Sequence, residues 1–199
     1  MTAKRRGRVS INGDVVEPDG ARISIFDRGF LYGDSIFETL RVYAGVPFAF
    51  DEHLSRFVRS GQKIGFSVPW SVEHIRADCM TVLEAAGLDD AYLRIVGTRG
   101  AGVMGLDPSL ASDPQLTVIV LELPSLPDSL YEDGRRAALV DVRRNLKVAV
   151  DPEAKTGNYI NSVMAVREAR LRGADEAIML DYEGRVAEGS SANVFVWLD

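Results

Sequence analysis

The sequence is poor in the residues that form disulfides and zinc sites. It contains one cysteine, Cys79, and two histidines, His53 and His74. A single cysteine excludes an intrachain disulfide, and one cysteine with two histidines argues against a zinc site built from these ligands. We therefore expect no metal, and this cysteine usage fits a cytoplasmic protein best.

Long hydrophobic runs and an excess of positive charge are also absent. The longest apolar run, residues 116–121, is far shorter than the about 20 residues of a membrane span and suits a buried strand. The basic residues 1–8 are followed by no apolar segment, which predicts a solvated arm rather than a secretory signal. The net charge of −6 provides no general attraction to nucleic acid or to anionic membranes. We expect neither as a partner.

What is present is the composition of a soluble globular protein. The chain has 199 residues, of which 46% are hydrophobic and 26% charged, enough for one large domain or two small ones. Over residues 1–122 the pattern predicts an α+β domain, with its helices packed on one sheet. Strands are expected at Val9–Ile11, Ile23–Phe26, Phe37–Tyr43, 92–98 and 116–122, and helices from near Asp51 and after Ser71.

A linker and a smaller second domain are expected beyond residue 122. Residues 123–130 contain two prolines directly after a strand, which is typical of an interdomain linker. Residues 131–199 then predict a strand at 137–142, a helix at 160–172, and three short strands at 177–180, 185–188 and 193–197. A domain of this size is near the lower limit of independent stability, so it needs support from the first domain, another subunit or further sequence.

Several side chains are candidates for chemistry, and each also has an ordinary structural interpretation. Lys155 is followed closely by Gly157, Asn158 and Tyr159, so a desolvated, nucleophilic amine competes with a solvated surface lysine. Glu188 ends a predicted strand before a Gly-Ser-Ser turn, where a site residue and a plain strand-terminating acid are both possible.

Three further candidates carry positive charge or a hydroxyl. Arg56 lies beside the apolar stripe of its helix, so its fork either reaches inward to an anion or stays exposed. Tyr92 and Arg94 are two apart on a strand and share a face, where they either grip a carboxylate or form an outward polar surface. Residues 99–102 are glycine-rich but lack the Lys-Ser/Thr of a P-loop, and no Gly-x-Ser-x-Gly is present.

Four segments together resemble the class IV aminotransferase family. They are Phe26–Arg41 (FDRGFLYGDSIFETLR), His53–Phe57 (HLSRF), Tyr92–Arg94 with Thr98–Gly100, and Lys155 through Asn193. Their order and spacing cover nearly the whole chain except the basic arm. The resemblance implies a two-domain fold, with an N-terminal α/β sandwich and a C-terminal barrel-like domain that is incomplete in this chain, because family members continue past residues 193–195.

The resemblance also implies a cofactor, pyridoxal 5'-phosphate, and roles for the candidates. Lys155 would form the internal Schiff base and shuttle the substrate proton, Glu188 would pair with the pyridine nitrogen, and Arg56 would hold the phosphate. The remaining cofactor contacts would be Tyr159, Ser191 and Asn193, and those of the substrate pocket Tyr32, Phe37, Tyr92 and Arg94. Family members are usually homodimers, so the same is expected here.

The expected reaction is transamination between an α-amino acid, of the L-branched-chain type, and a 2-oxo acid. Residues 99–105 lack the second arginine that D-amino acid enzymes place after this Arg-Gly, which argues against that branch. Thr39 stands where branched-chain enzymes have glycine, and this weakens a narrow substrate assignment. Two alternatives stay open: an aminodeoxychorismate lyase that releases pyruvate, and a non-catalytic truncated module that dimerises.

Overall fold

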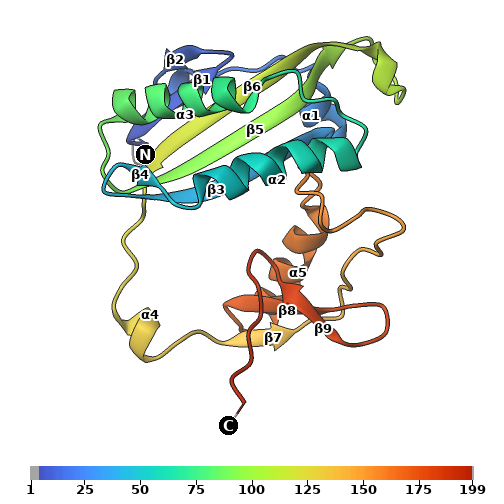
Figure 1. Ribbon diagram of the computed structural model, residues 1–199. Coiled ribbons are helices and arrows are strands. Elements are labelled where there is room, and N and C mark those ends of the chain that lie inside the picture. The colour runs from blue at the N-terminus through green and yellow to red at the C-terminus, as the bar shows by residue number, and fades with distance from the viewer. Residues whose placement is uncertain (1–4, 199) are drawn as a thin grey trace. The chain divides into compact units, whose positions relative to one another are not determined.

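The computed structural model describes residues 5–198, which divide into two compact units (Figure 1). One unit is Met1–Pro124 with Glu153–Gly157, and the other is Ser125–Pro152 with Asn158–Asp199. The predicted domains, 1–122 and 131–199, differ in assigning the Lys155 segment to the second part, and as domain boundaries they stay a prediction. Of the predicted basic arm, residues 1–4 lie outside the described range, while Gly7 and Arg8 already belong to the first strand.

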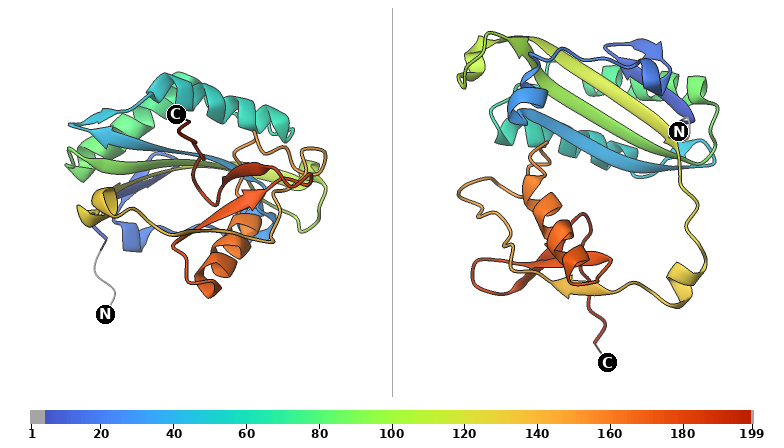
Figure 2. Two further views of the ribbon diagram at one scale, coloured as in Figure 1. Left: turned by 90° about the horizontal axis from the view of Figure 1, so that it is seen from below. Right: turned by 180° about the vertical axis from the view of Figure 1, so that it is seen from behind.

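The first unit is a six-stranded antiparallel sheet with two helices on one face (Figures 1 and 2). The strand order is β2-β1-β6-β5-β3-β4. The strands are β1 (Gly7–Ile11), β2 (Asp14–Val16), β3 (Ser35–Tyr43), β4 (Val46–Pro47), β5 (Ala91–Gly102) and β6 (Ala111–Glu122). The helices are α1 (Arg28–Tyr32), α2 (Phe50–Lys63) and α3 (Val72–Ala86), with short 3-10 turns η1 (Pro18–Gly20) and η2 (Pro108–Leu110).

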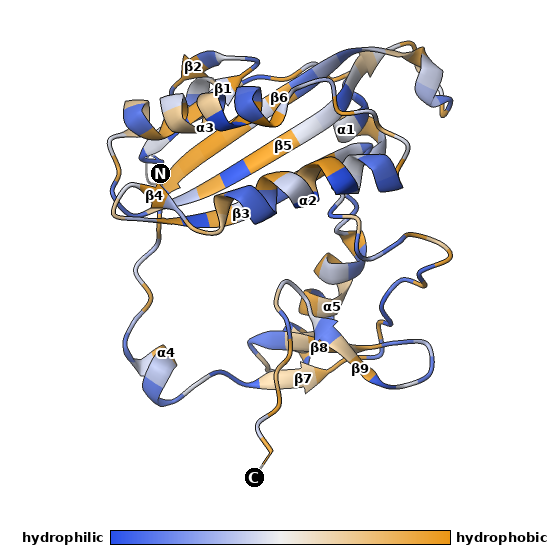
Figure 3. Cartoon of the chain, viewed as in Figure 1, coloured by the Kyte–Doolittle hydropathy of each residue, from blue (hydrophilic) through white to orange (hydrophobic). Residues whose placement is uncertain are grey.

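The core of this unit lies between the sheet and helices α2 and α3. Along β3, Ile36, Leu40 and Val42 are buried, whereas Arg41 and Tyr43 are exposed. This alternation is the period-2 pattern of a strand that is covered on one face. In Figure 3 the central strands β5 and β6 have hydrophobic stretches that are interrupted by pale and hydrophilic residues. Cys79 is fully buried here, and its burial raises the pKa of the thiol.

The predicted helices of this unit are confirmed, and their ends have clear causes. The Ser71 side chain caps α3 by accepting a hydrogen bond from the backbone N–H of His74. Gly87 ends the same helix in the left-handed conformation, at a φ of 60°, which glycine adopts without steric cost. The predicted strands at 9–11, 37–43, 92–98 and 116–122 are confirmed as well.

The predicted strand at Ile23–Phe26 is wrong. The Asp27 backbone N–H donates to the Ser24 carbonyl, and the Phe26 N–H donates to Ser24 Oγ, so the chain turns here instead of extending. Asp27 then caps α1, a helix that the sequence pattern did not predict, by accepting from the Gly29 N–H at 2.7 Å. Local side-chain hydrogen bonds therefore outweigh the β-propensity of the two isoleucines.

The second unit is a three-stranded sheet with one long helix. The order is β7-β8-β9, with β7 parallel to β8 and β9 antiparallel to it. Its elements are β7 (Ala137–Leu139), β8 (Glu176–Leu180), β9 (Val186–Gly189), α4 (Ser129–Glu132) and α5 (Ile160–Leu171). Small residues at Ala165 and Ala169 let α5 pack closely on Ala177 and Met179 of β8. The predicted helix at 160–172 and the strands at 177–180 and 185–188 are confirmed, whereas the strand predicted at 137–142 ends at Leu139.

The predicted third strand at 193–197 is wrong. Within residues 5–198 no strand pairs with this segment, and Phe195 and Trp197 are 89% and 91% exposed. The backbone turns back just before it, where the Gly189 N–H donates to the Ala192 carbonyl at 2.7 Å. A β-like sequence without a neighbouring strand gains no ladder hydrogen bonds.

No helix in the described part of the chain is long and apolar enough to cross a membrane.

Candidate active site

The Lys155 segment is attached to the edge of β3. The Phe37 N–H donates to the Lys155 carbonyl, and the Gly157 N–H donates to the Ser35 carbonyl, each at 2.9 Å. Between these bonds, Ile36 and Thr156 form an antiparallel bridge. Although Lys155 lies 112 residues beyond the end of β3 in sequence, its backbone is therefore held like a short added strand.

The Lys155 amine lies among three other predicted site residues of the first unit. Its Nζ is 4.4 Å from the centroid of the buried Phe37 ring, and the Arg94 guanidinium is 3.9 Å from the same centroid. Arg94 also donates to the Tyr92 hydroxyl at 3.3 Å, which confirms that the two share a face of β5. Two cations at one aromatic ring create a positive site that suits a carboxylate ligand.

Arg56 does reach inward, but its partner there is a carboxylate of the protein. Its Nε and Nη2 lie 2.5 and 2.6 Å from the two oxygens of Glu38. His53 Nδ1 contacts the same carboxylate at 2.8 Å, and the Glu38 side chain is fully buried. Glu38 points to the helix-covered face of β3, opposite to Phe37, because successive strand residues alternate. The Arg56 side chain remains 44% exposed.

Tyr32 belongs to a different cluster of the first unit, at the end of α1. Its hydroxyl accepts from the Gly105 N–H at 3.2 Å, and the Arg28 guanidinium stacks over its ring. Arg28 and Arg99 both donate to Asp34, at 2.9 and 2.8 Å. Burial would raise the pKa of Asp34, but the hydrogen bonds and charges of Arg99 and Arg28 hold it below its ordinary value. This network ties the start of β3 to the loop that follows β5.

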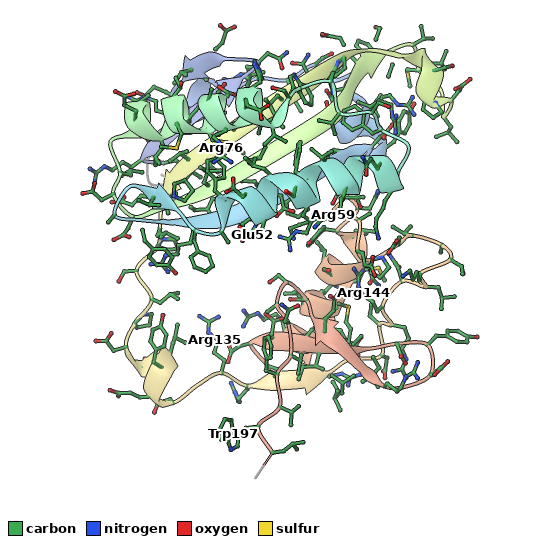
Figure 4. The ribbon with its side chains drawn as sticks, viewed as in Figure 1. Glu52, Arg59, Arg76, Arg135, Arg144 and Trp197 are labelled. Carbon is green, nitrogen blue, oxygen red and sulfur yellow. The ribbon has the colours of Figure 1, made fainter. Side chains whose placement is uncertain are left out.

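In the second unit, Glu188 lies on β9 and forms an ion pair with Arg144 (labelled in Figure 4). Arg144 is itself fixed by a backbone hydrogen bond to Leu180 of β8, at 3.0 Å. Both side chains are partly buried, Arg144 at 21% and Glu188 at 36% exposure. The ion pair with Arg144 holds the Glu188 carboxylate in place on β9, and a carboxylate is the group that partners a pyridine nitrogen.

The other predicted cofactor contacts of the second unit are exposed. Tyr159 precedes the first turn of α5, with 38% of its surface accessible, and Ser191 and Asn193 follow β9. The neighbouring Ser190 is buried and donates its hydroxyl to Glu176. Burial acts to raise the pKa of Glu176, yet hydrogen bonds from Ser190 and from the Ala177 and Ser190 N–H groups lower it overall. The Gly-Ser-Ser turn is thus anchored to β8 by a carboxylate.

The matches to known proteins agree with this arrangement. The family model described as "Amino-transferase class IV" matches residues 35–199. The chain belongs to the class IV aminotransferase family. A Methanocaldococcus jannaschii protein described as a putative branched-chain-amino-acid aminotransferase is 40% identical over 189 residues, covering 95% of this chain and 65% of the relative. A D-alanine aminotransferase of Bacillus licheniformis is 29% identical, with 95% and 65% covered.

A solved class IV aminotransferase has the same fold. The branched-chain aminotransferase of the archaeon Thermoproteus uzoniensis, solved with norvaline, superposes with a TM-score of 0.83 and 32% identity, covering 92% of this chain and 63% of that one. The predicted α+β, two-domain class IV fold is thereby confirmed. Class IV aminotransferases depend on pyridoxal phosphate, so the cofactor prediction is confirmed through the family. The chain spans less than two thirds of the length of these proteins, at 65% and 63%.

Three residues that contact the predicted site residues were missed by the sequence predictions. Glu38 was detectable as an acid at an inward position between Ile36 and Leu40. Ser60 was detectable as a polar residue on the apolar face of α2, where it is 1% exposed. Arg144 carries no local signal, because its pairing with Glu188 depends on how the strands assemble.

Among residues 5–198, no three His, Cys, Asp or Glu side chains gather as metal ligands would.

Proposed function

We propose that this class IV aminotransferase carries out pyridoxal-phosphate-dependent transfer of an amino group between an α-amino acid and a 2-oxo acid. The observation that carries the proposal is the Lys155 amine, held by the β3 edge and placed with Arg94 at the Phe37 ring. A lysine anchored through its backbone, with an arginine beside it that can bind a carboxylate, suits covalent chemistry on an amino acid.

The donor set fits pyridoxal phosphate. The cofactor needs an amine for its aldehyde, an acid for its pyridine nitrogen and cationic groups for its phosphate, and the chain supplies Lys155, Glu188 and Arg56. When bound, the cofactor supplies an electron sink for the charge left on the substrate Cα. In the proposal, Lys155 holds the cofactor covalently and then moves the proton at Cα, while the ion pair with Arg144 holds the Glu188 carboxylate in place on β9.

The remaining residues take binding roles. Arg56 would bind the phosphate with its guanidinium plane fixed by Glu38. Tyr159 would donate to the phenolic oxygen, and Ser191 and Asn193 would complete the cofactor contacts. On the substrate side, Arg94 and Tyr92 would bind the carboxylate beside Phe37. Tyr32, which belongs to the separate α1 cluster with Arg28 and Gly105, would contact the substrate from there.

For the substrate we propose an L-branched-chain amino acid, because the 40% identical relative and the solved Thermoproteus uzoniensis enzyme bear that name. Thr39 is the position at which this chain differs from branched-chain enzymes, which have glycine there. Its hydroxyl lies 3.4 Å from the Tyr92 hydroxyl, so a side chain occupies space beside the carboxylate-binding pair. Amino transfer to 2-oxoglutarate, compared with pyruvate release from aminodeoxychorismate, separates transamination from the lyase alternative.

We also propose that the protein works as a cytoplasmic homodimer. In support, neighbouring segments that meet at the Asp27–Ala101 bridge expose several large apolar side chains. They are Phe26, Phe30, Val103, Met104 and Leu106, each at least 50% exposed. Exposed apolar clusters of this kind commonly mark protein interfaces. Sedimentation velocity of the wild type and of Leu106→Glu tests it, because a dimer sealed by this surface should dissociate in the variant.

The deciding experiment is a visible absorbance spectrum after incubation with pyridoxal phosphate and removal of the excess. We expect a cofactor band in the wild type, its loss in Lys155→Ala, and borohydride fixation of the label on the peptide that contains Lys155. Lys147→Ala is the matched control, since this lysine is exposed in the second unit. A folded wild-type protein without band or label would refute the proposal.

A further inference from the structure

Ser60 contacts the backbone amide of Lys155 through its side chain. Its Oγ accepts the Lys155 N–H at 3.1 Å. This bond comes from helix α2, whereas the hydrogen bonds of the Lys155 carbonyl and the Gly157 N–H are made to β3. The lysine backbone is therefore held from two elements that belong to the same unit.

The burial of Ser60 makes this hydrogen bond important for stability. The residue is 1% exposed and lies on the inward face of α2, near Phe57 and Gly61, where apolar or small residues are expected. A hydroxyl at such a position is costly unless it is hydrogen-bonded. The bond to Lys155 supplies that partner, and it also satisfies a backbone N–H that leads into a partly buried lysine.

Fixing the Lys155 backbone fixes the position of its amine. The amine lies 4.4 Å from the Phe37 ring centroid, and Phe37 is the residue whose backbone N–H binds the Lys155 carbonyl. The backbone and the side chain of Lys155 thus both contact Phe37 of β3. Ser60 in turn fixes the orientation of the peptide group that precedes the lysine. Small displacements of a reacting group reduce rates strongly.

We propose that Ser60 is a positioning residue for the Lys155 amine, acting through the Lys155 backbone amide. The inference rests on the proposed function, because it concerns how readily that amine reacts with pyridoxal phosphate. Ser60 touches neither cofactor nor substrate in this role. Its hydroxyl holds the nucleophile in place and does not merely fill the core.

The test compares Ser60→Ala with Ser60→Thr, which keeps the hydroxyl, and with Ser55→Ala, which removes an exposed hydroxyl from the same helix. Two quantities are measured on each folded protein: hydrogen exchange of the Lys155 amide, and the rate of borohydride-fixed labelling by pyridoxal phosphate at Lys155 relative to Lys147. For Ser60→Ala we expect faster amide exchange and a labelling ratio lower by about three- to tenfold, the effect of one lost hydrogen bond. Ser60→Thr should restore the ratio, and Ser55→Ala should leave it unchanged.

The outcomes separate this inference from the proposed function. Wild-type labelling that does not favour Lys155 over Lys147 refutes the proposed function, and the positioning role with it. Labelling that favours Lys155 equally in the wild type and in Ser60→Ala refutes the positioning role alone, as does unchanged amide exchange. If Ser60→Ala fails to fold, Ser60→Cys, whose thiol is a weak acceptor, provides the same comparison.

Discussion

Glu38 and Arg56 form a two-point ion pair in which one partner is fully buried and the other is 44% exposed. This asymmetry makes the carboxylate dependent on the arginine, while water can solvate the arginine without the carboxylate. His53 contacts the same carboxylate at 2.8 Å, so it stays a partner of Glu38 when Arg56 is removed.

From this pair we expect that removing Arg56 and removing Glu38 lower the free energy of unfolding by different amounts. Arg56→Ala leaves the buried Glu38 carboxylate with His53 but without its guanidinium partner, and should cost about 3 kcal/mol of unfolding free energy. Glu38→Gln leaves a half-exposed cation and should cost about 1–2 kcal/mol. Urea unfolding followed by Trp70 fluorescence, in a Trp197→Phe background that removes the exposed second tryptophan, measures both. Equal costs, or the reverse order, would contradict this account of the pair.

Much of the first unit could be predicted from sequence, because its signals are local. The α2 and α3 helices follow from apolar spacing, the Ser71 cap and Gly87, and the long strands follow from alternation. The strand expected at Ile23–Phe26 failed because Ser24 and Asp27 form their own hydrogen bonds. The strand expected at 193–197 failed because pairing requires a neighbour, which no local pattern encodes.

Residues for the candidate site could be proposed from the sequence, but the contacts that those residues make could not. The sequence pattern named Lys155, Arg94 and Glu188 as candidates, and the resemblance gave their expected roles. The attachment of Lys155 to β3, however, depends on a bridge between Ile36 and Thr156, which are 120 residues apart. The contacts of Ser60 and Arg144 have the same origin in long-range assembly. Their roles become visible only once strands and helices are placed.

The ion pairs of Asp34 should make the stability of the protein depend on pH in the acid range. Its pKa in the folded protein is lowered by Arg99 and Arg28 against the effect of burial, from an ordinary value of 3.8. A depressed folded pKa contributes stability that is fully present above the unfolded pKa and is lost as the pH falls through the folded one. Asp34→Asn should therefore be less stable than the wild type at pH 7, and the difference should shrink below about pH 4.

Thermal midpoints of both proteins between pH 7 and pH 3 measure this effect. The exposed Asp90 provides the comparison, and Asp90→Asn should follow the wild type across the range. A difference between Asp34→Asn and the wild type that stays constant down to the lowest pH would show that the ion pairs with Arg28 and Arg99 do not carry the contribution.

Gly157 predicts a steric limit at the β3 edge. A Cβ built on this residue would lie 2.3 Å from Ser35 Oγ, so Gly157→Ala forces the added strand away from β3. We expect a loss of about 1–3 kcal/mol, as for other overpacked sites, and faster hydrogen exchange across residues 153–157. Gly20→Ala is the control, because nothing lies within 4 Å of a Cβ there. Ser35→Ala should partly rescue Gly157→Ala, and strictly additive effects would exclude the clash.

Replacing Glu188 should lower the rate of transamination without unfolding the protein. Under the proposed function its charge stabilises the protonated pyridine ring, so Glu188→Gln should lower kcat by about 10²-fold, the scale of removing one preorganised electrostatic contact. The isosteric amide keeps the place of the carboxylate on β9 beside Arg144, and the thermal midpoint should change little. The measurements are steady-state transamination and a melting curve of the same sample.

The matched control for Glu188 is Glu183→Gln, which removes an exposed acid from the turn between β8 and β9 while leaving Arg144 paired. Because both variants remove one negative charge from neighbouring parts of the second unit, general electrostatics would affect them alike. A specific role requires that Glu188→Gln lose rate and that Glu183→Gln retain it. A parallel loss in both would assign the effect to the charge of the unit, and normal turnover in Glu188→Gln would remove Glu188 from the cofactor site.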